Sequence, residues 1–82
     1  DYSFLGNDGR TFYFATDNSA PKGRVIAIDL DSPLPEQWRE LIAEGSDSIQ
    51  SVSLLGNTFF VQYLHDAISR IGMFDLLGNH RG

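Results

Sequence analysis

Three blocks of this sequence occur twice, in the same order along the chain. Residues 3–7 (SFLGN) recur as 53–57 (SLLGN), 11–14 (TFYF) as 58–61 (TFFV), and 24–30 (RVIAIDL) as 70–76 (RIGMFDL). The copies lie 46 to 50 residues apart, and the offset changes only between blocks. A unit of four short antiparallel strands in about 40 to 50 residues is typical of one blade of a β-propeller. The repeat therefore predicts two blade-like units, residues 1–48 and an incomplete second one at 49–82, cut from a larger propeller.

Runs of β-branched and aromatic residues between turn-forming residues predict about seven strands in meander order. We expect these strands at 3–5, 11–16, 24–30, 38–42, 49–55, 58–65 and 69–75, with turns at 6–9 and 56–57. The segment 38–42 also has the marks of a helix, because Pro35 stands near its start and Gly45 follows its end. Trp38, Leu41 and Ile42 have helical spacing as well. We predict a short strand and keep the helix as the alternative.

The apolar pattern and the composition set the fold class. Residues 12–15 and 59–61 are apolar at consecutive positions, which is typical of strands covered on both faces. The chain is 41% hydrophobic, so we expect it to be folded and not disordered. It has no cysteine, so neither disulfides nor a zinc site with thiolate ligands is expected. The absence of disulfides is compatible with either the cytoplasm or the periplasm. Its net charge of −5, with scattered Lys and Arg, argues against nucleic-acid binding, and no apolar run is long enough for a membrane span. We predict an all-β fold, an antiparallel meander of about seven short strands that makes up roughly two propeller blades.

The order of several short motifs resembles the middle of the propeller of prolyl oligopeptidases. These motifs are residues 2–9 (YSFLGNDG), the aromatic strand 11–14, Ala20-Pro21 before Arg24, Ile28-Asp29, Trp38 after an acidic loop, and Tyr63-Leu64-His65-Asp66 followed by Asp75-Leu76 and Gly78. The resemblance covers nearly the whole chain. It implies a serine peptidase, a prolyl endopeptidase, that cleaves short peptides after proline.

The same resemblance implies a role and partners for this segment. In the family, a propeller caps an α/β-hydrolase domain, admits short peptides and excludes folded proteins. The implied partners are thus the remaining blades, the hydrolase domain and short peptide substrates, and the segment itself would be structural and gating. Two alternatives stay open: a fragment of a non-enzymatic propeller scaffold, and an autonomous module that binds partners through its edge strands.

No catalytic, cofactor-binding or metal-binding residue is predicted in the chain. The Gly-x-Ser-x-Gly pentapeptide of a nucleophile elbow does not occur. His65 and Asp66 could form a base with its orienting carboxylate, but neighbours on a strand point to opposite faces or sit in a turn, and a turn role is favoured. His80 is expected to be exposed, and the two histidines lack metal-ligand spacing.

The remaining polar candidates are interpreted as structural. Asp29 and Asp75 hold equivalent positions at strand ends, which favours bonding to the backbone of the next turn over calcium binding. Glu36, Glu40 and Glu44 would form an acidic stripe on a helix, but on a strand and loop they are expected to be solvated. Trp38 is expected to pack beneath a loop.

Two blades without neighbours would leave apolar side chains uncovered. We expect Phe12, Phe14, Phe59, Val61 and Tyr63 to be partly exposed, and such patches usually find a partner. Self-association of the chain, by dimerisation or stacking, follows as an expectation.

Overall fold

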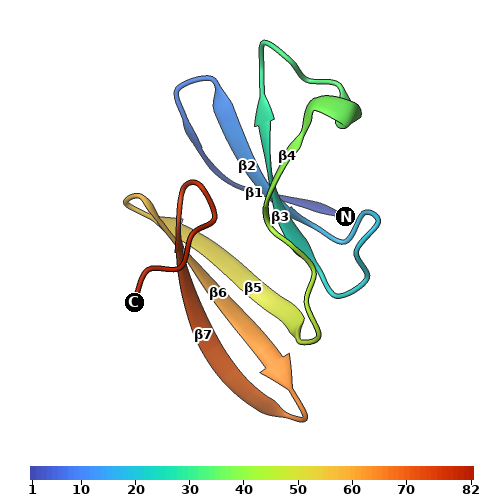
Figure 1. Cartoon of the computed structure of the whole chain (residues 1–82), viewed down its shortest axis with the longest axis vertical. Helices are drawn as coiled ribbons and strands as arrows, with labels where there is room; N and C mark the ends of the chain where they lie inside the picture. The colour runs from blue at the N-terminus through green and yellow to red at the C-terminus, as the bar shows by residue number, and fades with distance from the viewer.

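A computed structural model describes all of residues 1–82 and contains seven strands in two sheets (Figure 1). The strands are β1 (Tyr2–Asp8), β2 (Thr11–Thr16), β3 (Arg24–Asp29), β4 (Arg39–Ile42), β5 (Ser48–Leu55), β6 (Thr58–His65) and β7 (Ile68–Asp75). A 3₁₀ turn, η1 (Pro35–Gln37), is the one helical element, and no helix is long and apolar enough to cross a membrane. The predicted number of strands is confirmed.

Each sheet is an antiparallel meander. The first sheet has the order β1-β2-β3-β4 and the second has the order β5-β6-β7. Figure 1 shows them as two groups, blue to green and yellow to red, joined by the linker that follows β4. Tight two-residue turns connect β1 to β2, β5 to β6 and β6 to β7. The all-β class and the meander order predicted from the sequence are confirmed.

The structure corrects the position of the first turn and shows that segment 38–42 is a strand. The first turn is Gly9-Arg10, not 6–9, because β1 continues to Asp8 past a bulge between Phe4 and Gly6. Segment 38–42 is a strand over Arg39–Ile42, as predicted, and the helical alternative is wrong. Backbone pairing with β3 outweighs the local helix signals, which yield only the three-residue turn η1.

The core lies between the two sheets. One face of the first sheet provides Tyr13, Val25, Ala27 and Ile42, and one face of the second provides Phe59, Val61, Tyr63 and Phe74. The rings of Tyr13 and Phe59 meet edge to face across the interface, with centroids 5.3 Å apart. Each fully buried large side chain of this kind contributes about 1.5–3 kcal/mol relative to an exposed one.

The expected exposure is wrong for three of the five residues. Phe59 and Val61 are fully buried and Tyr63 is 7% exposed, because this face of β6 packs on the first sheet. Phe12 and Phe14 are only half-buried, as expected, because they lie on the opposite face of the first sheet.

Strand pairing shows which repeat blocks correspond. Thr11 pairs with Asp29 in the first sheet, and Thr58 pairs with Asp75 in the second. The second block (11–14 and 58–61) and the third block (24–30 and 70–76) therefore occupy equivalent positions in the two sheets. The first block does not, since Gly56-Asn57 forms the β5–β6 turn, whereas Gly6 and Asn7 lie inside β1. Both β1 and β5 contain a bulge, so the mismatch comes from the turn, which follows Asp8 in the first sheet and Leu55 in the second.

Candidate functional site

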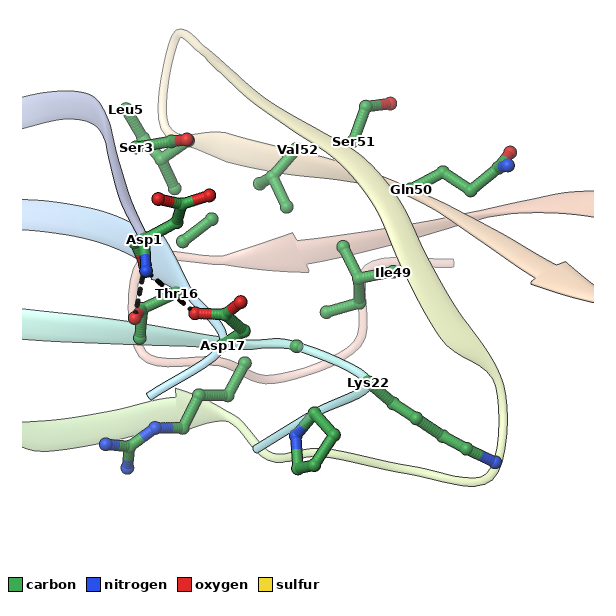
Figure 2. A pocket seen from close by; sticks show the side chains of 14 residues that line it. Asp1, Ser3, Leu5, Thr16, Asp17, Lys22, Ile49, Gln50, Ser51 and Val52 are labelled. Atoms are coloured by element: carbon green, nitrogen blue, oxygen red, sulfur yellow. Dashed lines mark hydrogen bonds and ion pairs between the residues drawn. The ribbon is translucent and has the colours of Figure 1, made fainter. Parts of the chain in front are cut away.

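A groove runs between the two sheets at the end where β2 finishes and β5 begins (Figure 2). Its volume is about 460 Å³, and its lining is mixed polar and apolar. Figure 2 shows Ile49 and Val52 of β5 on one side, Asp1 and Asp17 on the other, and Lys22 directed away from the groove. The lining residues are Asp1, Ser3, Leu5, Ala15, Thr16, Asp17, Pro21, Lys22, Gly23, Arg24, Ile49, Gln50, Ser51 and Val52.

The polar groups on the first-sheet side of this groove bond to one another. The backbone nitrogen of Asp1 lies 2.9 Å from the Asp17 carboxylate. The Thr16 hydroxyl donates to the Asp1 carbonyl at 2.7 Å and accepts from the Asn18 N–H at 3.0 Å. The groove lining includes no histidine to activate its serine hydroxyls. The arrangement is suited to shaping a surface between two sheets.

Lys22 fixes the linker between the sheets. Its backbone N–H donates to the Glu44 carboxylate at 2.6 Å, and its Nζ donates to the Ser46 carbonyl at 2.7 Å. Its carbonyl accepts the N–H of Ile49 at 2.8 Å. Three hydrogen bonds from one residue thus tie the β2–β3 loop to the segment that leads into β5.

A second cluster lies around His65, at the turn between β6 and β7. His65 Nδ1 is 2.8 Å from Asp47 Oδ1, and His65 Nε2 is 3.2 Å from Asp66 Oδ2. Arg70 Nε donates to Asp47 Oδ2 at 3.1 Å, and the Arg70 guanidinium lies 4.2 Å from the centroid of the Tyr63 ring. A shallow pocket of about 350 Å³ is lined by Asp47, His65, Ile68 and Arg70.

The geometry around His65 differs from that of a catalytic triad. Both ring nitrogens face carboxylates, so neither is directed at a hydroxyl that could serve as a nucleophile. The turn role favoured from the sequence agrees with the structure, since β6 ends at His65 and Asp66 lies in the turn before β7. Asp66 and Ala67 both adopt positive φ, at 49° and 64°, and this two-residue turn brings the Asp66 carboxylate back to the ring.

The two equivalent aspartates make different contacts. Asp75 accepts the N–H groups of Leu77 and Asn79 at 2.9 Å each, as predicted for a turn residue, and these bonds, that of Asn79 first, lower its pKa. Asp29 instead accepts from the Thr11 hydroxyl at 2.8 Å and from Arg39 at 3.1 Å, which lowers its pKa. The prediction of backbone bonding is therefore wrong for Asp29, because Arg39 pairs with Ala27 in β3 and its guanidinium reaches the Asp29 carboxylate.

The acidic stripe is broken into separate contacts. Glu36 is exposed on η1, Glu40 lies 3.3 Å from Arg24 Nη1, and Glu44 accepts the Lys22 N–H. All three are exposed, as expected, but Glu40 and Glu44 also contact residues that are distant in the sequence.

Trp38 and His80 each lie against another ring. Trp38 is half-buried, donates from Nε1 to the Pro33 carbonyl at 3.0 Å, and meets the Tyr2 ring edge to face. This agrees with packing beneath a loop. His80 is exposed, as expected, and its ring lies 4.5 Å from that of Phe74.

Comparison with known proteins places this two-sheet structure in a family. The sequence profile described as "Prolyl oligopeptidase, N-terminal beta-propeller domain" matches residues 1–81. The chain belongs to the prolyl oligopeptidase N-terminal β-propeller family. The resemblance drawn from the sequence motifs is thereby confirmed, and the chain corresponds to part of the propeller domain of prolyl endopeptidases.

Individual prolyl endopeptidases show the same relationship. The chain is 38% identical over 74 residues to the prolyl endopeptidase of Elizabethkingia miricola, and 35% identical over 71 residues to that of Elizabethkingia meningoseptica. These alignments cover 90% and 87% of the chain but only 10% of each relative. The chain thus spans about a tenth of the length of these curated relatives.

Solved structures of the family superpose closely on the chain. A prolyl endopeptidase from a study of inter-domain dynamics in two such enzymes gives a TM-score of 0.90 at 33% identity, covering 99% of this chain and 12% of that one. The ligand-free prolyl oligopeptidase B of Galerina marginata gives 0.87 at 27% identity, covering 98% and 12%. The β-propeller fold class is confirmed.

Sequence reasoning missed the residues that organise both clusters in this propeller segment. Asp47 and Lys22 lie in loops, and Arg70 lies 23 positions beyond Asp47. No periodic pattern links residues at such separations. Only the polar character of the residues before β5 could have drawn attention to the linker.

Proposed function

We propose that residues 1–48 form one blade, and residues 49–82 an incomplete part of the next blade, in the propeller of a serine peptidase that cleaves short peptides after proline. The match of the family profile to residues 1–81 is the observation that carries this proposal. Two meander sheets packed face to face over one core support it. Adjacent blades of a propeller pack in this way around a central channel.

In this proposal the segment forms part of the wall of the propeller and supplies no catalytic residue. Its partners are the remaining blades, an α/β-hydrolase domain that carries the catalytic serine, histidine and aspartate, and short peptides that reach that domain. The blades restrict access by size, because a channel bounded by rigid sheets admits an extended peptide more readily than a folded domain. The Lys22 bonds and the buried Tyr13–Phe59 contact supply rigidity between the two sheets.

The test uses the longer protein that contains this sequence. Its gene should encode a Gly-x-Ser-x-Gly sequence beyond the propeller, and the purified protein should release a chromophore from a blocked Gly-Pro amide. Replacement of the serine in that pentapeptide by alanine is the matched control and should abolish the release. Peptides of about ten residues should be cleaved after proline, whereas a folded protein with an exposed proline should not. A propeller protein without a hydrolase domain would refute the proposal and favour the scaffold alternative.

A further inference from the structure

The groove between the two sheets lies where the sheets come closest together. Of the strands in different sheets, β1 and β5 run closest to each other, and β4 and β7 lie at the far edges. The blades of a propeller surround a central channel and converge toward it, so in the proposed propeller β1 and β5 border this channel. The groove is lined by the first half of each of these strands and by the β2–β3 loop. Neighbouring blades pack on the outer faces of the two sheets, so they leave the groove open.

Both strands that border the groove have a free edge. β1 pairs only with β2, and β5 pairs only with β6. Along their other edges the backbone N–H and C=O groups have no strand partner, although the Ile49 N–H is taken by the Lys22 carbonyl. An extended peptide binds such an edge by adding to the sheet as a further strand. The groove thus offers backbone hydrogen bonds to a peptide of any sequence.

The free charges of the groove are negative. The carboxylates of Asp1 and Asp17 lie on its first-sheet side (Figure 2), and the Asp17 side chain is 57% exposed. The two basic residues of the lining are engaged elsewhere. Lys22 Nζ donates to a carbonyl of the linker at 2.7 Å, and the Arg24 guanidinium lies 3.3 Å from the Glu40 carboxylate. The groove therefore favours a ligand that carries a positive charge.

The apolar part of the groove suits the stem of a basic side chain. Leu5, Ile49 and Val52 line it and are half-buried. A lysine or an arginine packs its methylene groups on such a surface and keeps its charged end beside a carboxylate or in water. The groove volume of about 460 Å³ is within the range of sites that hold small ligands. It is large enough for one such side chain and the adjoining backbone.

We propose that this groove is a subsite for extended peptide substrates and that it prefers a segment with a lysine or an arginine. This inference rests on the proposed function, because a peptidase that admits short peptides brings them to the channel that the groove borders. The groove binds the peptide away from the proline bond and takes no part in the reaction. Asp17 is a specificity residue, because its carboxylate meets the basic side chain.

Pairs of peptides test this inference on the longer protein. Each peptide has about twelve residues, which span about 40 Å when extended, and contains a single proline. The two members of a pair differ only in a lysine or a glutamine at one position, and this position moves along the peptide from pair to pair. At one position or a few adjacent ones, the lysine peptide should have a KM about two- to five-fold lower, the effect of one partly exposed ion pair. The kcat values should be equal, because the contact is the same before and during the reaction.

Asp17→Asn should bring the ratio of the two KM values at that position close to one. Asp31→Asn is the matched control and should keep the ratio. Asp31 also has an exposed carboxylate, paired with Arg10, but it lies beyond the opposite end of β3. A second measurement needs no substitution. Raising the ionic strength from about 0.01 M to about 1 M shortens the screening length from about 30 Å to about 3 Å, so the ratio should fall in the unaltered protein as well.

Equal KM values for every peptide pair would overturn the inference, as would a preference that Asp17→Asn and Asp31→Asn reduce equally. Hydrolysis of the blocked Gly-Pro amide tests the proposed function alone. A protein that cleaves this amide but does not distinguish the lysine and glutamine peptides would refute only the groove subsite. Binding of the same peptides, followed by fluorescence anisotropy, makes the comparison without turnover if the amide is not cleaved.

Discussion

Gly78 should be the glycine least tolerant of a side chain, because it lies against the other sheet. It adopts φ +87° in the turn after β7, and its N–H donates to the Asp75 carbonyl at 3.0 Å. A Cβ at this position would overlap the carbonyl oxygen of Leu41 in β4. Gly78→Ala therefore forces apart the end of the second sheet and the edge strand of the first.

The expected loss of stability has two parts. An alanine held at positive φ costs about 1 kcal/mol relative to glycine. Overpacking against a neighbour that cannot rotate away adds about 1–3 kcal/mol. Gly56 provides the matched control, since it has φ +58° but an added Cβ would meet no atom within 4 Å, so Gly56→Ala should show the first part alone. Gly78→Ala should thus cost about 1–3 kcal/mol more than Gly56→Ala.

Urea unfolding of the 82-residue chain, followed by the fluorescence of Trp38, measures this difference. Trp38 is half-buried beside Tyr2 and should report loss of the first sheet. With a slope of about 1 kcal/mol per molar urea, the midpoint of Gly78→Ala should lie about 1–3 M below that of Gly56→Ala. Equal midpoints for the two variants would show that the contact between Gly78 and Leu41 does not hold the sheets together.

Three further predictions concern the charged contacts and the core. The pKa of Asp75 is lowered by the N–H groups of Asn79 and Leu77, so its contribution to stability is present above about pH 4 and is lost as the pH falls through the folded-state pKa. Asp75→Asn should flatten the acid side of a plot of melting temperature against pH, and an unchanged acid side would contradict this. Asp47→Ala removes a carboxylate shared by His65 and Arg70 and should cost about 1 kcal/mol in urea unfolding. Asp66→Asn removes the exposed carboxylate but keeps a residue that tolerates positive φ, so it should cost less than about 0.5 kcal/mol, and equal losses would argue against a central role for Asp47. A double-mutant cycle with Tyr13→Leu and Phe59→Leu should give a coupling energy of about 0.5–1.5 kcal/mol across the interface, and strict additivity would rule out a specific ring contact.

The sequence by itself determined the strands, their order and the family. Thr58–His65 was predicted with the bounds that the structure shows, because β-branched and aromatic residues between Gly56-Asn57 and Asp66-Ala67 encode a strand locally. Segment 38–42 carries helix signals that are also local, so the sequence leaves both a strand and a helix open there. The pairing of Arg39–Ile42 with β3 decided it.

Only the tertiary structure decided which face of each strand is buried. The run 58–61 is apolar at successive positions, and the packing of the second sheet on the first selects Phe59 and Val61 for the core and leaves Phe60 outside. The contacts of Asp29, Lys22 and His65 depend in the same way on loops and strands that fold back from distant parts of the chain. The alternation of apolar and polar residues and the turn residues determine structure over only a few positions. The sheet interface, in contrast, brings together residues about 46 positions apart, such as Tyr13 and Phe59. The repeat therefore predicts two sheets, but only the packing of one sheet on the other determines which face of each strand is buried.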